Sequence, residues 1–331
     1  MITLKLLNFI LINTSLIGSS FFIYFLLNYK KNHSLLYVLL SICVLYFSLV
    51  TVIIIGFGVF GMISSLNVSI ISYAIFLLLT FVLRKKIFLL KEIKNLIIQN
   101  RNKIKNKSNF IMGGIIFAPA FILLSIRFFI ALFQIPFEFD SLVYHLPIVT
   151  QWLQTGSIMD VYYTAFAGPL AYYPSNFDIF YLWSILPLQS DIFVNLLNFP
   201  LFILFSLAIY ATSINFGIRK KIALFISAFP LYIPVFMQQA GTVFVDTYFV
   251  LTFVLSIFFL QEIAKNTANK LNSILFGLTI GLFIGTKYLG LPYSFIPIVI
   301  FLFIHLFQKN KNYTALTLGL FSSFMTGSFF I

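Results

Sequence analysis

The 331-residue chain is 61% hydrophobic and 9% charged, and its mean hydropathy is +1.04. These values exclude a soluble globular domain, which normally carries ~25% charged residues. Its single cysteine, Cys43, excludes an intramolecular disulfide, and three scattered histidines provide no structural zinc site. The formal charge of +13 fits either nucleic-acid binding or the basic inner loops of a membrane protein, and the positions of the basic residues distinguish the two.

Apolar runs of about 16 to 26 residues recur along the chain, close to the ~20 residues with which an α-helix crosses a bilayer. Backbone polar groups must be satisfied within lipid, so the fold is either a helical bundle or a closed barrel. The runs are continuously apolar, whereas barrel strands alternate. We therefore predict an all-α polytopic membrane protein with about ten transmembrane helices. The predicted spans are Leu6–Leu27, Leu35–Phe60, Val68–Leu83, Phe110–Phe133, Asp191–Gly217, Ile222–Gln239, Thr247–Ala264, Leu271–Thr286, Leu289–Phe307 and Tyr313–Ile331.

The first three spans and the segment after them form a predicted N-terminal anchor, residues 1–109. Leu6–Leu27 is too long for a signal-peptide core, so we expect it to be retained. Arg84–Lys107 holds nine Lys or Arg residues against Glu92, with apolar residues at helical spacing. We predict an amphipathic helix on the inner membrane surface, with a solvated linker as the alternative. Nucleic-acid binding is disfavoured, because no aromatic residue follows Phe88 in this segment.

Residues 110–331 form a second predicted region, with a long outer loop at 134–190. This loop lacks Lys and Arg but contains four acidic residues and both tryptophans. Aromatic residues of this kind favour the membrane–water interface. The apolar stretch Asn176–Leu188 is too short to span a bilayer, so we predict a juxtamembrane helix at the interface.

The charges give one consistent orientation for ten spans. With the amino terminus outside, the inner loops collect 18 of the 21 basic residues, and six of the eight acidic residues fall outside. Cytoplasmic loops of membrane proteins carry such an excess of Lys and Arg. The net charge therefore reflects topology, and it gives no indication of a nucleic-acid partner.

Four charged residues are the candidate functional residues. Glu138 and Asp140 lie where the fourth span gives way to the outer loop, and the predicted topology brings Asp246 and Lys287 to the same face. Ionisable groups at a membrane edge are functional candidates. A carboxylate can accept a proton from a hydroxyl, and a lysine on an otherwise acidic face suits a phosphate.

Structural interpretations exist for the same residues. Asp140 and Asp246 could each cap the helix that follows. Lys287 could extend to the interface or pair with Asp246.

Other polar residues accompany this group. Tyr144 and His145 are candidate supporting residues, and His145 also fits a buried polar partner or an interfacial residue. Arg127 lies inside the fourth span and needs a partner, for which an outer acid is the candidate. His305, near the inner end of a span, is expected to serve packing.

A family resemblance follows from this outer loop. Its residues are Glu138-Phe-Asp140-Ser-Leu-Val-Tyr144-His145-Leu-Pro147, followed by Trp152-Leu-Gln-Thr-Gly156-Ser. They resemble the first outer loop of GT-C glycosyltransferases, with protein O-mannosyltransferases, aminoarabinose transferases and bacterial relatives as the nearest kin. In that family an acidic pair, often a modified Asp-x-Asp, follows a membrane span. The resemblance implies that Asp140 is the catalytic base.

Later motifs match those of the family in their order along the chain and in the side of the membrane on which they are predicted to lie. The resemblance covers about Phe110 to Phe307. Tyr172-Tyr173-Pro174 falls where the family has a Pro-containing turn before a juxtamembrane helix. Asp246 is similar to an acid between two later spans, and Gly285-Thr286-Lys287 to a small-residue–Lys element. Three spans precede the family-like part, and the chain stops at Ile331 in an apolar run where relatives continue, so either a shortened member or a truncated product is expected.

The resemblance implies an inverting glycosyltransferase in the bacterial cytoplasmic membrane, with its active site on the outer face. A polyprenyl-phosphate-linked sugar would be the donor, and a hydroxyl of a glycan, lipid or protein the acceptor. Lys287 would bind the donor phosphate, while Glu138 and Asp246 would orient the acceptor or bind a metal. The resemblance identifies no particular cofactor, and a divalent ion bound by Glu138 and Asp140 is the candidate. The competing interpretations are a transporter or flippase of lipid-linked or anionic solutes and an inactive truncated relative.

Overall fold

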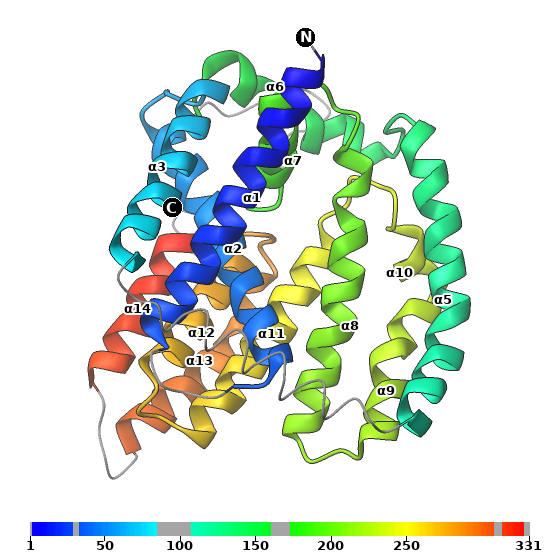
Figure 1. Cartoon of the computed structure of the whole chain (residues 1–331), viewed down its shortest axis with the longest axis vertical. Helices are drawn as coiled ribbons and strands as arrows, with labels where there is room; N and C mark the ends of the chain where they lie inside the picture. The colour runs from blue at the N-terminus through cyan, green and yellow to red at the C-terminus, as the bar shows by residue number, and fades with distance from the viewer. Residues whose placement is uncertain (1, 29–32, 85–106, 160–172, 308–312, 328–331) are drawn as a thin grey trace.

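The computed structural model describes residues 2–28, 33–84, 107–159, 173–307 and 313–327, and all regular elements in these ranges are helical (Figure 1). The all-α prediction is thereby confirmed. Most of the predicted amphipathic segment, residues 85–106, lies outside the described residues, as do Asp160 and Tyr172. The longer helices are α1 (Ile2–Leu27), α2 (Leu35–Val59), α3 (Ser65–Leu83), α5 (Lys107–Phe133), α6 (Leu146–Thr155), α7 (Asp178–Leu188), α8 (Asn198–Asn215), α9 (Lys220–Ala228), α11 (Asp246–Lys265), α12 (Lys270–Ile284), α13 (Gly290–Phe307) and α14 (Tyr313–Gly327).

Seven helices in the described ranges are long and apolar enough to cross a membrane. They correspond to seven of the predicted spans, so the multi-pass character of the chain agrees with the sequence. The count of ten is not confirmed. The seven are Thr3–Leu27, Leu35–Val59, Ser65–Leu83, Ile111–Phe133, Val194–Asn215, Asp246–Lys265 and Gly290–Phe307.

The other three predicted spans are broken or short helices. The run Ile222–Gln239 is divided into α9, η4 (Phe229–Tyr232) and α10 (Pro234–Gln238). Pro230 and Pro234 explain the division, because proline lacks the N–H that a continuous helix needs. Helix α12 has 15 residues, which at 1.5 Å per residue is about 22 Å, short of the ~30 Å hydrocarbon core. Helix α14 has 15 described residues, and residues 328–331 of that predicted span lie outside the described residues.

The helices do not end at one level on the side that carries the candidate residues. In Figure 1 the start of α1 and the upper ends of α5 and α8 lie near the top, whereas α11 and α14 end at about mid-height. Helix α7 lies above α11 in this view. The Tyr181 hydroxyl of α7 donates to the Phe244 carbonyl oxygen, 3.1 Å away, in the turn before α11. The start of α11, which carries Asp246, is therefore set below the upper ends of α5 and α8.

The short helix predicted between the outer loop and the next span is present. Helix α7 forms at the expected place, and ten of its eleven residues are buried in the protein core. The Trp183 indole Nε1 donates to Asn13 Oδ1 of α1 at 3.1 Å, and the Tyr46 hydroxyl of α2 donates to the same oxygen at 2.5 Å. The N-terminal helices thus hold α7 in place and share one hydrophobic core with the rest of the chain.

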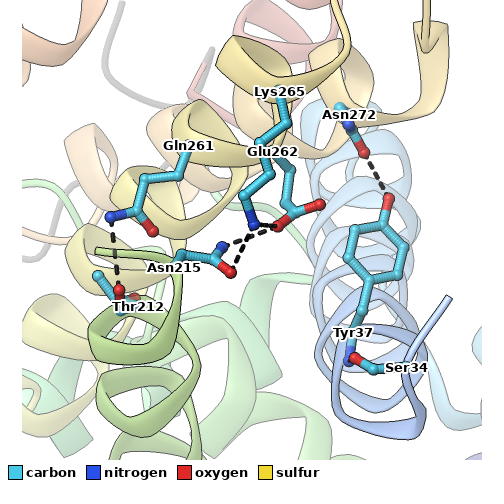
Figure 2. Close-up of polar contacts among 8 residues, drawn as sticks. All are labelled: Ser34, Tyr37, Thr212, Asn215, Gln261, Glu262, Lys265 and Asn272. Atoms are coloured by element: carbon cyan, nitrogen blue, oxygen red, sulfur yellow. Dashed lines mark hydrogen bonds and ion pairs between the residues drawn. The ribbon is translucent and has the colours of Figure 1, made fainter. Parts of the chain in front are cut away.

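A polar cluster ties the helices together at the opposite end (Figure 2). Asn215 Nδ2 of α8 donates to Glu262 Oε1 of α11 at 2.7 Å, and Lys265 Nζ bonds both Asn215 and Glu262. The Tyr37 hydroxyl of α2 donates to Asn272 Oδ1 of α12 at 2.5 Å. These contacts fix the C-terminal end of α11, whose other end begins with Asp246.

Candidate active site

The outer loop begins with Glu138 and Asp140, which lie at the start of a helix. The backbone becomes helical at Phe139, continues through the π-helical turn η1 (Ser141–His145) and leads into α6. Asp140 has helical dihedral angles, φ −61° and ψ −38°, and its side chain makes no capping hydrogen bond within the described residues. The capping interpretation of Asp140 is therefore wrong. Single π turns inside helices often mark functional sites.

Glu138 takes the structural role at this helix start. Its Oε2 accepts hydrogen bonds from the Phe137 backbone N–H at 3.3 Å and from the Ser141 hydroxyl at 3.2 Å. Its Oε1 is buried and has no hydrogen-bond partner in the described parts of the chain. A buried carboxylate oxygen without a hydrogen-bond partner is energetically unfavourable. Glu138 Oε1 is therefore available to accept a hydrogen bond from a ligand.

Tyr144 connects Asp140 to the other acids. Its hydroxyl lies close to the Asp140 carboxylate. Burial, followed by the negative charges of Asp140, Asp178 and Asp246, raises the pKa of Tyr144. Burial and the charges of Asp178, Asp246 and Glu138 likewise raise the pKa of Tyr181. Four carboxylates thus lie close enough to act on two neighbouring tyrosines, and both tyrosines stay protonated as neutral donors.

His145 pairs with Asp178, a residue that sequence reasoning did not select. His145 Nδ1 lies 2.7 Å from Asp178 Oδ1, and the two residues are only 4% and 2% exposed. The ring centroids of Tyr144 and His145 are 4.1 Å apart. The prediction of His145 as a buried polar partner agrees with this geometry. Asp178 was noted as an acid of the outer loop, but its role follows from the burial of α7, which the sequence did not indicate.

Asp246 and Lys287 form an ion pair, one of the alternatives open from sequence. Both side chains are partly exposed, 38% and 30% respectively. Gln239 Nε2 donates to Asp246 Oδ2 at 3.3 Å, while Gln239 Oε1 accepts from the Thr247 hydroxyl at 3.1 Å. The N-cap position of α11 is Val245, so Asp246 occupies the first turn, where a helix N-terminus favours a carboxylate. The prediction that Asp246 and Lys287 share a face is confirmed by their contact.

The Lys287 turn is anchored to the segment before α7. The Asn176 backbone N–H donates to the Gly285 carbonyl oxygen at 2.8 Å, and Asn176 Nδ2 donates to the Thr326 carbonyl oxygen at 2.8 Å. A Cβ added at Gly285 would lie 2.1 Å from Asn176 Nδ2. Tyr173 packs against Tyr288, with ring centroids 5.2 Å apart. Glycine at 285 therefore permits the close approach that brings Lys287 and Asp178 into one neighbourhood.

Arg127 lies beside Glu138 without forming an ion pair. The two residues line one cavity of about 280 Å³, together with Gln134, Gln238 and Thr242. The predicted pairing of Arg127 with an outer acid is not found, because no carboxylate in the described ranges is within salt-bridge distance of it. His305 is buried as predicted, with its Nε2 3.3 Å from the Ser273 hydroxyl.

The metal alternative receives no support from the donor set. Among the residues that the structure describes, no group of three or more His, Cys, Asp or Glu side chains could hold a metal ion. Glu138 and Asp140 by themselves would leave most of a coordination sphere to water or substrate. We therefore derive no chemical step through a metal.

Comparison with known families and proteins adds one match. A family model described as dolichyl-phosphate-mannose-protein mannosyltransferase matches residues 151–330. No curated protein and no solved structure matches the chain. The matched range contains Asp178, Asp246 and Lys287 and begins after Asp140.

Proposed function

Because the chain belongs to the dolichyl-phosphate-mannose-protein mannosyltransferase family of membrane glycosyltransferases, we propose that it moves a sugar from a polyprenyl-phosphate donor to an acceptor hydroxyl. We place the reaction on the outer face of the cytoplasmic membrane. The observation that carries this proposal is the gathering of Glu138, Asp140, Asp178 and Asp246 around Tyr144 and Tyr181. Such a polar site at one end of an apolar bundle suits a donor whose tail stays in lipid and whose head meets water.

Asp140 is the proposed general base. Its carboxylate makes no capping bond within the described residues, so it is free for chemistry, and the Tyr144 hydroxyl lies close to it. The acceptor oxygen would attack the anomeric carbon as its proton passes to Asp140, and the donor phosphate would leave. A single displacement inverts that carbon. General-base assistance of this kind typically contributes ~10²–10⁴-fold in rate.

Lys287 is the proposed contact for the leaving phosphate. In the described structure its ammonium pairs with Asp246, which Gln239 also contacts. A donor phosphate would compete with Asp246 for Lys287, because both are anionic partners for the same cation. Asp246 would then be available to orient hydroxyls of the acceptor, together with Glu138.

The orientation is supported by where basic residues lie. The ends of α9, α11 and α12 that lie opposite the carboxylate group carry or adjoin five basic residues: Arg219, Lys220, Lys221, Lys265 and Lys270. Positive residues of this kind are enriched on the cytoplasmic side.

A transfer assay tests the proposal. The purified protein in lipid nanodiscs is supplied with polyprenyl-phosphate sugars as donors and with membrane extracts as the source of acceptors. A glycosyltransferase should release polyprenyl phosphate and form a new glycosidic bond. In sealed liposomes, movement of the donor lipid between leaflets without such a bond would favour a transporter and overturn the proposal.

A further inference from the structure

Two cavities lie along the face of α5 that packs on the rest of the chain, a face marked by the buried residues Ala120 and Ala131. The outer cavity is the polar one, about 280 Å³, that contains Arg127 and Glu138. The inner cavity, about 380 Å³, is apolar and lies between α5, α8 and α9. Its walls include Phe117, Phe121, Leu124, Phe202, Ser206 and Tyr210.

The outer cavity combines two opposite binding preferences. Arg127 forms no ion pair with any described residue, and a guanidinium in this state matches a phosphate with paired N–H groups. Glu138 Oε1 is buried and, among the described residues, has no partner, and a carboxylate accepts hydrogen bonds from hydroxyl groups. A ligand that fits both carries a phosphate and free hydroxyls in one headgroup.

The inner cavity suits the tail of the same ligand. Phe117 is ten residues before Arg127 on α5, a rise of roughly 15 Å along the helix. This length is about half of the ~30 Å hydrocarbon core, so a headgroup at Arg127 with a tail beside Phe117 spans one leaflet. Ser206, in the cavity wall, is only 7% exposed, and its hydroxyl has no partner in the described structure. The cavity wall therefore contains a buried hydroxyl whose hydrogen-bonding capacity the described protein groups do not use.

We propose that these cavities bind the acceptor, an anionic phosphodiester lipid of the outer leaflet whose headgroup carries free hydroxyls. This inference rests on the proposed glycosyltransferase function and names its acceptor class. Arg127 would bind the phosphodiester, Glu138 would accept from one hydroxyl, and the tail would lie between α5, α8 and α9. Glu138 is two residues from Asp140, so the headgroup lies next to the proposed base.

The transfer step balances with these groups. The headgroup hydroxyl oxygen forms a bond to the anomeric carbon, and its proton passes to the Asp140 carboxylate. The bond from that carbon to the donor phosphate oxygen breaks, and its electron pair leaves on the phosphate held at Lys287. The products are a glycosylated lipid headgroup and polyprenyl phosphate.

Lipid binding is measured first, because it does not depend on turnover. The full chain in phosphatidylcholine nanodiscs is given phosphatidylglycerol with a photoreactive acyl chain, and crosslinks are mapped by mass spectrometry. We expect crosslinks at Phe117 to Leu124 that fall about tenfold in Arg127→Gln and in Ser206→Leu. Two controls at positions that line neither cavity should leave the crosslinks unchanged: Lys5→Gln, which also removes a positive charge, and Ser125→Leu. Equal crosslinking by a phosphatidylcholine probe, or none of the expected loss in Arg127→Gln, would identify ordinary annular lipid and overturn the proposal.

Turnover then separates the two proposals. With a polyprenyl-phosphate sugar, the wild-type protein should attach sugar to phosphatidylglycerol, and Arg127→Gln should raise the KM for this lipid about tenfold with the donor KM unchanged. Transfer to another acceptor but never to phosphatidylglycerol would overturn the acceptor assignment and leave the proposed function intact. Specific crosslinking in a protein that transfers no sugar would contradict the proposed function, and with it the acceptor role, while the lipid site itself would stand.

Discussion

His145 Nδ1 lies 2.7 Å from Asp178 Oδ1, although 33 residues separate the two along the chain. The pair joins the helix of the outer loop to the buried helix α7, and it lies directly beside Tyr144 and thus beside Asp140. Because both residues are buried, the contact fixes which nitrogen of His145 faces Asp178. The pair therefore positions the loop that carries the proposed base.

Removal of Asp178 is expected to destabilise the protein through His145. Asp178→Ala leaves the His145 Nδ1 buried without a partner, which costs about 1–3 kcal/mol, whereas Asp178→Asn retains an oxygen and should cost less. Thermal unfolding in detergent measures both. The exposed Asp191, changed to Ala, is the control, and it should unfold like the wild type. Equal stability of Asp178→Ala and the control would show that the pair does not hold the loop.

The Gly285 turn gives a second prediction. Gly285→Ala places a Cβ 2.1 Å from Asn176 Nδ2, so the turn or Asn176 must move, and Lys287 with it. We expect a loss of stability of about 1–3 kcal/mol together with reduced activity. Gly113→Ala, in a helix and with no atom within 4 Å of the added Cβ, should be neutral or slightly stabilising. If both variants behave alike in unfolding and activity, the close approach of Asn176 and Gly285 contributes neither to stability nor to activity.

Lys287 is predicted to act on the donor. Lys287→Ala should raise the donor KM more than Lys287→Arg, because arginine keeps a cation for the phosphate. The ion pair with Asp246 requires a second comparison, the double variant with Asp246→Asn. If Lys287 contacts the phosphate, Lys287→Ala should still raise the donor KM in the Asp246→Asn background. A donor KM that no longer responds to Lys287→Ala in that background would mean that Lys287 serves only to hold Asp246.

Much of the architecture was accessible from sequence because it depends on local composition. The seven long apolar helices follow runs that are visible without tertiary information, and the contact of Asp246 with Lys287 followed from counting sides of the membrane. The break at Pro230 and Pro234 was also present in the sequence, since two prolines inside one run disfavour a continuous helix.

The remaining features depend on tertiary packing. Asn176–Leu188 is short and apolar, a pattern that indicates neither the contact of Trp183 with Asn13 nor the burial of this helix within the protein. The pairing of His145 with Asp178 depends on that burial, so no local pattern indicated it. Asp140 resembled a helix cap by residue type, but the helix begins before it.

The predicted orientation can be tested with single cysteines. In a Cys43→Ser background, Ser157→Cys should react with an impermeant thiol reagent added to intact cells, since it follows α6 on the outer side. Ser108→Cys, at the start of α5, should react only after the membrane is opened. Labelling of the Ser108→Cys variant in intact cells would reverse the topology and place the carboxylate group on the inner side.

The central claim, that Asp140 is the general base, is tested most directly by the rate of sugar transfer in Asp140→Asn. The Asp140 side chain makes no capping bond within the described residues, so this isosteric change should leave thermal stability near the wild-type value. Because an amide cannot accept the proton, transfer should fall by ~10²–10⁴-fold. Glu138→Gln, at the proposed acceptor-binding acid two residues away, should lower the rate less. An Asp140→Asn protein that transfers sugar at the wild-type rate would contradict the assignment of Asp140 as the base.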